Sequence, residues 1–177
     1  MAYMTQHNEQ NPHKSVAGWM ITGAWVLVFG LLILFFQSYL DKEHNPNQDV
    51  SSITTSTGAR EVVLQRNRYG HYVVTGKING RSVEFMLDTG ATQIAIPSSV
   101  ASRLGLKRMH ETTIHTANGQ ARAYSTRLDT VSVGDIQLTN LSALITTGMG
   151  GDVILLGMSF LKHIEFTQRG DILILRQ

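Results

Sequence analysis

The chain has 177 residues, of which 42% are hydrophobic and 16% charged, and its formal net charge is only +2. So small a charge, without any block rich in lysine or arginine, argues against nucleic acid as a partner. The absence of cysteine excludes disulfides, thiolate metal sites and a cysteine nucleophile.

A long uncharged stretch near the N-terminus is the first predicted element. Residues 1–18 form a polar tail, and residues 19–40 are mostly apolar and carry no charged side chain. A helix of that length can cross a hydrocarbon core of about 30 Å. Trp19 and Tyr39 lie near its two ends, where aromatic rings favour the membrane interface. We therefore expect a single transmembrane helix over residues 19–40, in contact with the lipid bilayer.

A cleaved signal peptide is the competing interpretation of this stretch. Its apolar region would span about 7–15 residues and would end at a small-x-small cleavage site. The run here is longer, and it ends in Tyr39-Leu40-Asp41-Lys42-Glu43, so an uncleaved anchor is favoured. Lys14 and Lys42 flank the span almost evenly, and the charges therefore barely indicate its orientation. We expect the short tail inside and the large domain outside.

The remaining chain divides into a linker and one domain. Residues 41–60 are rich in serine, threonine and asparagine, and they bury too little apolar area to offset the cost of ordering. They predict a flexible linker. The folded domain is then expected over residues 61–177, which is enough for one small core.

The domain is predicted to consist of many short strands. Two hairpins are expected where Asn-Gly joins two strands, over residues 70–87 and 111–133. Short helices are expected over residues 97–104 and 157–163. Further strands are expected over residues 94–96, 136–146, 153–156, 164–167 and 172–176. This pattern predicts an all-β fold, a compact barrel with one or two short helices.

Asp88 is the residue most suggestive of chemistry. It follows the apolar run Phe85-Met86-Leu87 and precedes Thr89-Gly90-Ala91. A carboxylate at the end of a hydrophobic strand is costly to bury unless it is hydrogen-bonded or functional. Gly90 would let the backbone turn sharply and would leave room for another group to approach. We interpret Asp88 as a candidate catalytic residue, and the other acidic residues of the domain, which mostly lie at turns, as turn formers.

Other hydrolase signatures are incomplete. His110 and His115 are five residues apart in a threonine-rich strand, whereas a zinc-peptidase motif places its histidines four apart on a helix. The segment Gly157-Met158-Ser159-Phe160 lacks the closing glycine of a nucleophile elbow. We therefore expect neither a metal ion nor any other cofactor.

Three features in chain order resemble the retropepsin-like aspartic peptidases, and a fourth, Met158–Leu161, resembles the short helix of their membrane-anchored bacterial branch. Phe85–Ala91 resembles the active-site loop of that family. Thr116–Gln120 lies at a hairpin tip, where the family carries its flap. Ile154–Gly157 resembles the apolar strand that crosses behind the loop. The resemblance implies a retropepsin-like acid-protease barrel, and it implies a bacterial inner-membrane protein whose peptidase domain is periplasmic.

The resemblance also implies an aspartic endopeptidase that works as a homodimer. The chain has one Asp-Thr-Gly, so Asp88 from each subunit would complete a pair of carboxylates that share one proton and activate a water. A peptide or protein substrate would bind as an extended strand beneath the flap. The residues implied around Asp88 belong to the active-site loop (Thr89, Gly90 and Ala91), the flap (Ala117, Asn118 and Gly119) and the support behind the loop (Leu156 and Gly157).

Two questions stay open: whether the protein is catalytically active, and whether its last strand contacts a second subunit. The first arises from departures from the viral members of the family. An acidic residue and an arginine that pair in those members are replaced here by Thr92-Gln93 and Met158, and the flap has one glycine instead of several. The alternative function is a catalytically silent module that binds peptides or dimerises at the membrane. The segment Ile172–Leu175 could form an intersubunit sheet, as viral termini do, or an ordinary core strand.

Overall fold

The structure, a computed structural model, describes residues 13–54, 58–116 and 119–177. Its contacts divide the chain into two compact units, with the boundary between Leu40 and Asp41. Helix α1 (His13–His44) contains a segment, Gly18–His44, that is long and apolar enough to cross a membrane. Its large apolar side chains from Trp19 to Leu40 are exposed, as they are in a helix that faces lipid rather than a protein core.

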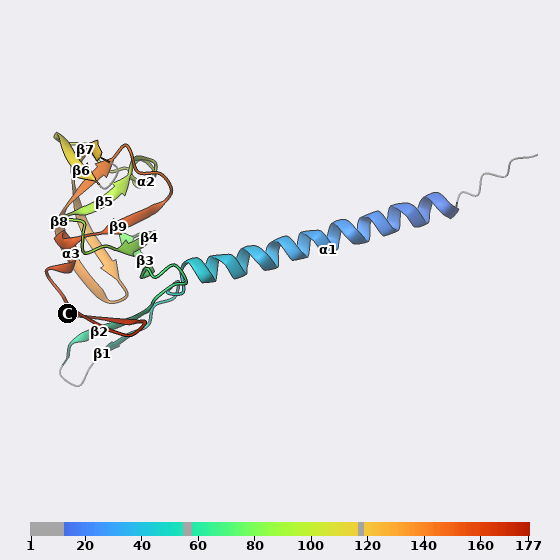
Figure 1. The fold of residues 1–177 in the computed structure, drawn as a ribbon, viewed down its shortest axis with the longest axis horizontal. Coiled ribbons are helices and arrows are strands. Elements are labelled where there is room, and N and C mark those ends of the chain that lie inside the picture. Colours follow the sequence, from blue (N-terminus) through green and yellow to red (C-terminus); the bar gives the residue numbers. More distant parts are fainter. Residues whose placement is uncertain (1–12, 55–57, 117–118) are drawn as a thin grey trace, which may run out of the picture. The chain divides into compact units, whose positions relative to one another are not determined.

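The second unit consists of residues 41–44 of α1, the β-strands and two short helices (Figure 1). One sheet has the order β3-β4-β9-β5-β8-β7-β6 and gains an additional β3–β7 pairing, and the other has the order β1-β2-β11-β10. The expected all-β barrel is therefore confirmed. The strands are β1 (Ser52–Thr54), β2 (Arg60–Gln65), β3 (Val73–Ile78), β4 (Arg81–Leu87), β5 (Ile94–Pro97), β6 (Glu111–Thr116), β7 (Gly119–Val133), β8 (Ile136–Thr146), β9 (Val153–Leu156), β10 (Glu165–Arg169) and β11 (Ile172–Arg176), and the helices are α2 (Ser98–Leu104) and α3 (Met158–Leu161).

Local turn chemistry explains the element boundaries that the sequence predicts. Strands β3 and β4 pair around Asn79 and Gly80, whose φ angles of 49° and 79° suit a two-residue hairpin turn. Helix α2 begins directly after Pro97 and ends at Gly105, which has a φ of 70°. Both hairpins and both short helices are confirmed.

The expected linker is partly packed against the domain. The Asn47 side chain, only 6% exposed, donates hydrogen bonds to the carbonyls of Gln65 (2.9 Å) and Val73 (2.6 Å) and accepts one from the Gln65 N–H (2.7 Å). The Asn47 carbonyl accepts from the Thr75 N–H. Asn47 thereby joins β2 of one sheet to β3 of the other, and the compact unit begins at Asp41 rather than at residue 61. Composition does not reveal this, because the side-chain amides of Asn45 and Asn47 hold the segment through hydrogen bonds, which an estimate from apolar area does not count.

A loop of the domain also holds the end of α1. The Asn67 side chain donates to the carbonyl of His44 (2.9 Å), and the Arg68 guanidinium pairs with the Glu43 carboxylate. The Tyr69 hydroxyl and the Glu43 carboxylate raise the pKa of Arg68 above its ordinary value. The last turn of the helix is therefore part of the domain.

Asn47→Ala is expected to lower the free energy of unfolding by about 2 kcal/mol, because the buried carbonyl of Val73 and the backbone N–H and carbonyl of Gln65 lose their partner. Urea unfolding of the full-length protein in detergent, followed by near-ultraviolet circular dichroism, measures this difference. Gln48→Ala is the control, since Gln48 is exposed. Equal stabilities of the two variants would contradict a structural role for Asn47.

Candidate active site

Asp88 directly follows the last residue of β4, inside the seven-stranded sheet. Strand β4 pairs antiparallel with β3 and parallel with β9, so both of its edges are occupied. Leu87 lies opposite Leu156, and the Asp88 N–H donates to the Leu156 carbonyl at 3.2 Å. Because the strand is held on both sides, the backbone that carries the Asp88 side chain is well fixed.

A tight turn orients the Asp88 carboxylate. Its Oδ1 accepts a hydrogen bond from the Gly90 N–H at 2.8 Å, and the Asp88 carbonyl accepts from the Ala91 N–H at 3.2 Å. The Asp88 side chain is half-buried, whereas Thr89 and Gly90 are exposed. An aspartate that bonds the backbone two residues ahead is an Asx-turn, and here the turn leaves the loop accessible from outside.

Gly90 serves this turn through the second of its two expected roles, the room that it leaves for another group. Its φ is not in the left-handed region, so the turn does not need the conformational freedom of glycine. A Cβ at position 90 would lie 3.1 Å from Asp88 Oδ1, closer than most Cβ contacts. Glycine is therefore suited to this position because it leaves space beside the carboxylate while its N–H binds it.

Gly157 lies directly behind the loop, at the end of β9. A Cβ at this position would be 2.4 Å from the Gln93 carbonyl oxygen and 2.6 Å from that of Ala91. No side chain fits there unless the backbone moves. The structure thus brings the predicted pair Leu156 and Gly157 against the loop, and it adds the backbone carbonyl of Gln93, a contact that the sequence did not predict.

Helix α3 contributes two further hydrogen bonds to the support. The Met158 N–H donates to the Ala91 carbonyl at 2.8 Å, and Ser159 Oγ accepts from the Ile94 N–H at 3.0 Å. Ser159 therefore positions the strand that follows the loop. Sequence reasoning missed this role, because a hydroxyl that binds a backbone group 65 residues away leaves no local pattern.

The predicted flap is the hairpin of β6 and β7. Gly119 begins β7 with a φ of 106°, and its carbonyl accepts a hydrogen bond from the Thr116 hydroxyl at 2.8 Å. The other two predicted flap residues, Ala117 and Asn118, lie outside the described residues. Across the hairpin Glu111 pairs with Arg122 at 3.8 Å. Within the described ranges, no group of three or more His, Asp or Glu side chains is arranged to hold a metal ion.

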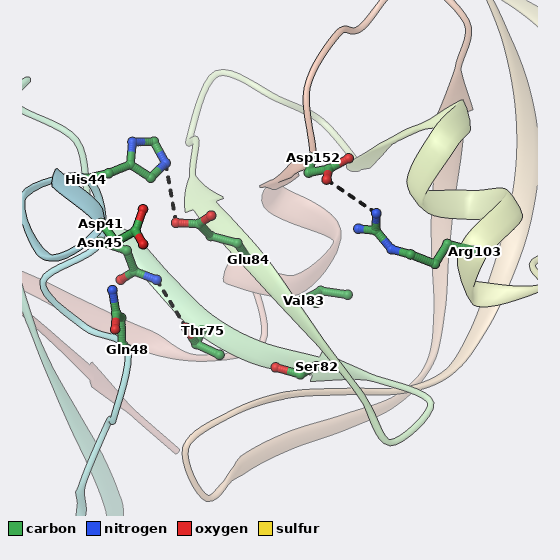
Figure 2. A pocket seen from close by; sticks show the side chains of 10 residues that line it. All are labelled: Asp41, His44, Asn45, Gln48, Thr75, Ser82, Val83, Glu84, Arg103 and Asp152. Atoms are coloured by element: carbon green, nitrogen blue, oxygen red, sulfur yellow. Dashed lines mark hydrogen bonds and ion pairs between the residues drawn. The ribbon is translucent and has the colours of Figure 1, made fainter. Parts of the chain in front are cut away.

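A polar cavity of about 390 Å³ lies elsewhere in the domain, and Asp88 does not line it (Figure 2). Its charged groups largely face one another: His44 Nε2 is 3.3 Å from Glu84 Oε1, and Arg103 Nη1 is 3.3 Å from Asp152 Oδ2. Among the described residues Glu84 Oε1 is buried without a hydrogen-bond partner, but no residue of the predicted active-site loop lines the cavity. The Asp88 loop, not this cavity, is therefore the candidate active site.

Comparison with known proteins gives consistent results. The sequence model of the family described as "gag-polyprotein putative aspartyl protease" matches residues 74–163. An uncharacterized protein of a Sinorhizobium species is 39% identical over 128 residues, which are 70% of this chain and 55% of that protein. An uncharacterized protein of Rickettsia prowazekii is 29% identical over 160 residues, or 85% of this chain and 68% of that protein. This chain thus matches little more than half the length of the Sinorhizobium relative.

A solved structure agrees with these sequence matches. The crystal structure of a retropepsin-like aspartic protease from Rickettsia conorii is 31% identical, with a TM-score of 0.58, over 72% of this chain and 95% of that one. The family match runs from β3 through the Asp88 loop to the end of α3. The chain therefore belongs to the family of retropepsin-like aspartic proteases.

Proposed function

We propose that the protein is a membrane-anchored aspartic endopeptidase, with an active centre formed by two Asp88 carboxylates from the two subunits of a homodimer. The observation that carries this proposal is the Asp88 turn, in which a half-buried carboxylate at the end of a central strand is oriented by the Gly90 N–H. One chain supplies one such turn, so a second copy related by a two-fold axis supplies the other. Membership of the family supports the assignment.

The chemistry is hydrolysis of a peptide bond by an activated water. Two carboxylates at close range do not both ionise, so the pair holds one proton. The ionised carboxylate takes a proton from the water, and the water oxygen attacks the scissile carbonyl carbon. The protonated carboxyl donates to the carbonyl oxygen. The C–N bond then breaks, the leaving nitrogen takes a proton, and the products are an acid and an amine.

The neighbouring residues take positioning roles in this proposal. Thr89 is exposed and would bind the partner's loop across the two-fold axis, and Ala91 would lie beneath the substrate backbone. The flap residues Ala117, Asn118 and Gly119 would close over the peptide, which adds as an extended strand with side chains on alternate sides.

Helix α1 supplies the anchor in this proposal, in the inner membrane of a bacterium with the domain on the periplasmic side. The exposed apolar side chains of Trp19–Leu40 support lipid contact. The full-length protein is expected to resist extraction with alkaline carbonate and to keep its complete mass. Protease added to spheroplasts is expected to reach the domain. A mature chain that begins beyond Leu40 would instead identify the segment as a signal peptide.

The test of the proposed activity is hydrolysis of a mixed peptide library by the full-length protein in detergent, at several pH values, with products read by mass spectrometry. Cleavage is expected at mildly acid pH, with inhibition by a statine-type transition-state mimic. Binding of peptides without cleavage would favour the alternative, a silent binding module.

One observation gives that alternative weight. The positions that carry an ion pair in viral members hold Thr92-Gln93 and Met158 here. In this structure the Met158 backbone N–H, not a side chain, binds the loop at the Ala91 carbonyl. A backbone hydrogen bond within one subunit thus braces the loop, and the lack of that ion pair favours the silent module.

A further inference from the structure

Strand β11 has no free edge with which to bind a second copy. It pairs antiparallel with β10 on one side and with β2 on the other. Leu173 and Leu175 on this strand are buried. Of the two alternatives for the terminal segment, the structure therefore supports the ordinary core strand. Within the described part of the chain, the edges of this four-stranded sheet are β1 and β10.

Strand β10 (Glu165–Arg169) is an open edge, and all five of its residues are exposed. A two-residue loop joins it to β11. The two residues that flank this loop therefore exchange hydrogen bonds with each other. Farther along the two strands, pairs that exchange hydrogen bonds alternate with pairs that do not. The odd-numbered residues of β10 thus turn their backbone groups toward β11. Phe166 and Gln168 turn their N–H and C=O groups to the open edge, where another strand can pair with them.

We infer that β10 pairs antiparallel with β10 of a second copy, with Thr167 opposite the partner's Thr167 on the two-fold axis. In this register Phe166 and the partner's Gln168 exchange two hydrogen bonds, and the symmetric pair exchanges two more. Glu165 stands opposite the partner's Arg169 on one face, and the same charge pair recurs across the axis. The five-residue strand is therefore complementary to itself.

The charges of β10 select this register. In the described residues neither Glu165 nor Arg169 takes part in an ion pair, so both are available to a second copy. In the nearest other registers that let the backbone groups of Phe166 and Gln168 bond the partner strand, the two strands are shifted by two residues relative to this one. One such shift places Glu165 opposite the partner's Thr167, and the other places Glu165 opposite the partner's Asp171. Both shifts lose the two opposite-charge pairs.

This interface rests on the proposed function, because an active centre with one Asp88 per chain is incomplete without a second copy. It differs from the terminal sheet that the resemblance suggests, since β10, the first strand of the β10–β11 hairpin, makes the contact instead of β11. Four hydrogen bonds and two exposed ion pairs form a weak interface by themselves. Two anchors in one membrane raise the effective concentration of the copies, so such an interface suffices there.

A single cysteine tests the register directly, since the chain has none of its own. Opposed residues in a pair without mutual hydrogen bonds have Cα atoms about 4.5 Å apart, which lies within the range of a disulfide. Full-length Thr167→Cys, in lipid vesicles under mild oxidation, is expected to give a covalent dimer as the main species on a non-reducing gel.

Two matched variants serve as controls for this experiment. Thr139→Cys places a thiol on an exposed threonine of β8 and is expected to remain monomeric on the gel. Glu165→Cys is also expected to remain monomeric, because the two copies of position 165 would lie about 13 Å apart. Equal cross-linking of Thr167→Cys and Thr139→Cys, or none by Thr167→Cys, would overturn the interface. Preferential cross-linking of Glu165→Cys would overturn the register.

Charge reversal gives a second readout that needs no cysteine. Arg169→Glu places like charges opposite each other twice and is expected to weaken dimerisation about tenfold, measured by sedimentation velocity in detergent. The swap Glu165→Arg with Arg169→Glu is expected to restore most of the affinity. Lys107→Glu, an equal change of charge at an exposed residue outside the strands, is expected to have no effect. Failure of the swap to restore dimerisation would reject the charge pairing.

The interface and the proposed activity fail in distinguishable ways. Peptide cleavage by a protein whose Thr167→Cys variant does not cross-link would reject the β10 contact and keep the endopeptidase. A protein that cross-links through position 167 but cleaves no peptide, before or after oxidation, would reject the endopeptidase and keep the interface.

Discussion

Asp88→Asn is expected to lower the rate of peptide hydrolysis about a thousandfold or more, because an amide cannot take a proton from the attacking water. The fold is expected to persist, since the asparagine Oδ1 can still accept the hydrogen bond from the Gly90 N–H. Asp129→Asn is the matched control, an identical change at an exposed residue of β7. Product formation by mass spectrometry, on the full-length protein in detergent, compares the three proteins. Equal rates for wild type and Asp88→Asn would exclude the proposed centre.

The same variant tests whether two subunits share the centre. A mixed dimer holds one Asp88, so a ninefold excess of Asp88→Asn over wild-type chains is expected to lower total activity about tenfold once the subunits have exchanged. A ninefold excess of Asp129→Asn, which keeps Asp88, is expected instead to add activity. If added Asp88→Asn leaves the wild-type rate unchanged, each chain works alone and the shared centre is wrong.

Gly157→Ala is expected to lower the free energy of unfolding by about 3 kcal/mol and to remove most of the activity. The new Cβ would lie 2.4 Å from the Gln93 carbonyl oxygen and 2.6 Å from that of Ala91. Both atoms belong to the backbone, so the strain cannot be relieved by a change of rotamer. Relief requires a shift of the loop that carries Asp88.

Gly150→Ala is the control for this substitution. Position 150 has open space around its Cβ and no positive φ, so the added methyl is expected to be nearly neutral. Urea unfolding gives the stability, and peptide cleavage by the folded fraction gives the activity. Equal stability of Gly157→Ala and Gly150→Ala would show that the loop accommodates a side chain from behind, and the proposed support would be wrong.

Local patterns in the sequence determined much of the domain. The Asn79-Gly80 turn sets the first hairpin, because positive φ angles at two successive positions restrict the choice of residues. The two ends of helix α2 can be predicted from Pro97 and Gly105, because each of these residues restricts or frees the backbone at its own position. Asp88 stands out because its carboxylate directly follows an apolar strand. The cost of placing a charged group there is evident from the sequence. Its role in catalysis stays a prediction.

The tertiary structure alone decided the contacts between distant segments. Asn47 lies in a polar stretch that composition assigns to a linker, yet its amide joins two sheets through hydrogen bonds to Gln65 and Val73. Gly157 needs to be glycine because of the carbonyls of Gln93 and Ala91, which the chain reaches only after folding. Strand order likewise occupies both edges of β11 and leaves β10 free. Sequence patterns report the preferences of neighbouring residues, whereas these features depend on which distant backbone groups the fold brings together.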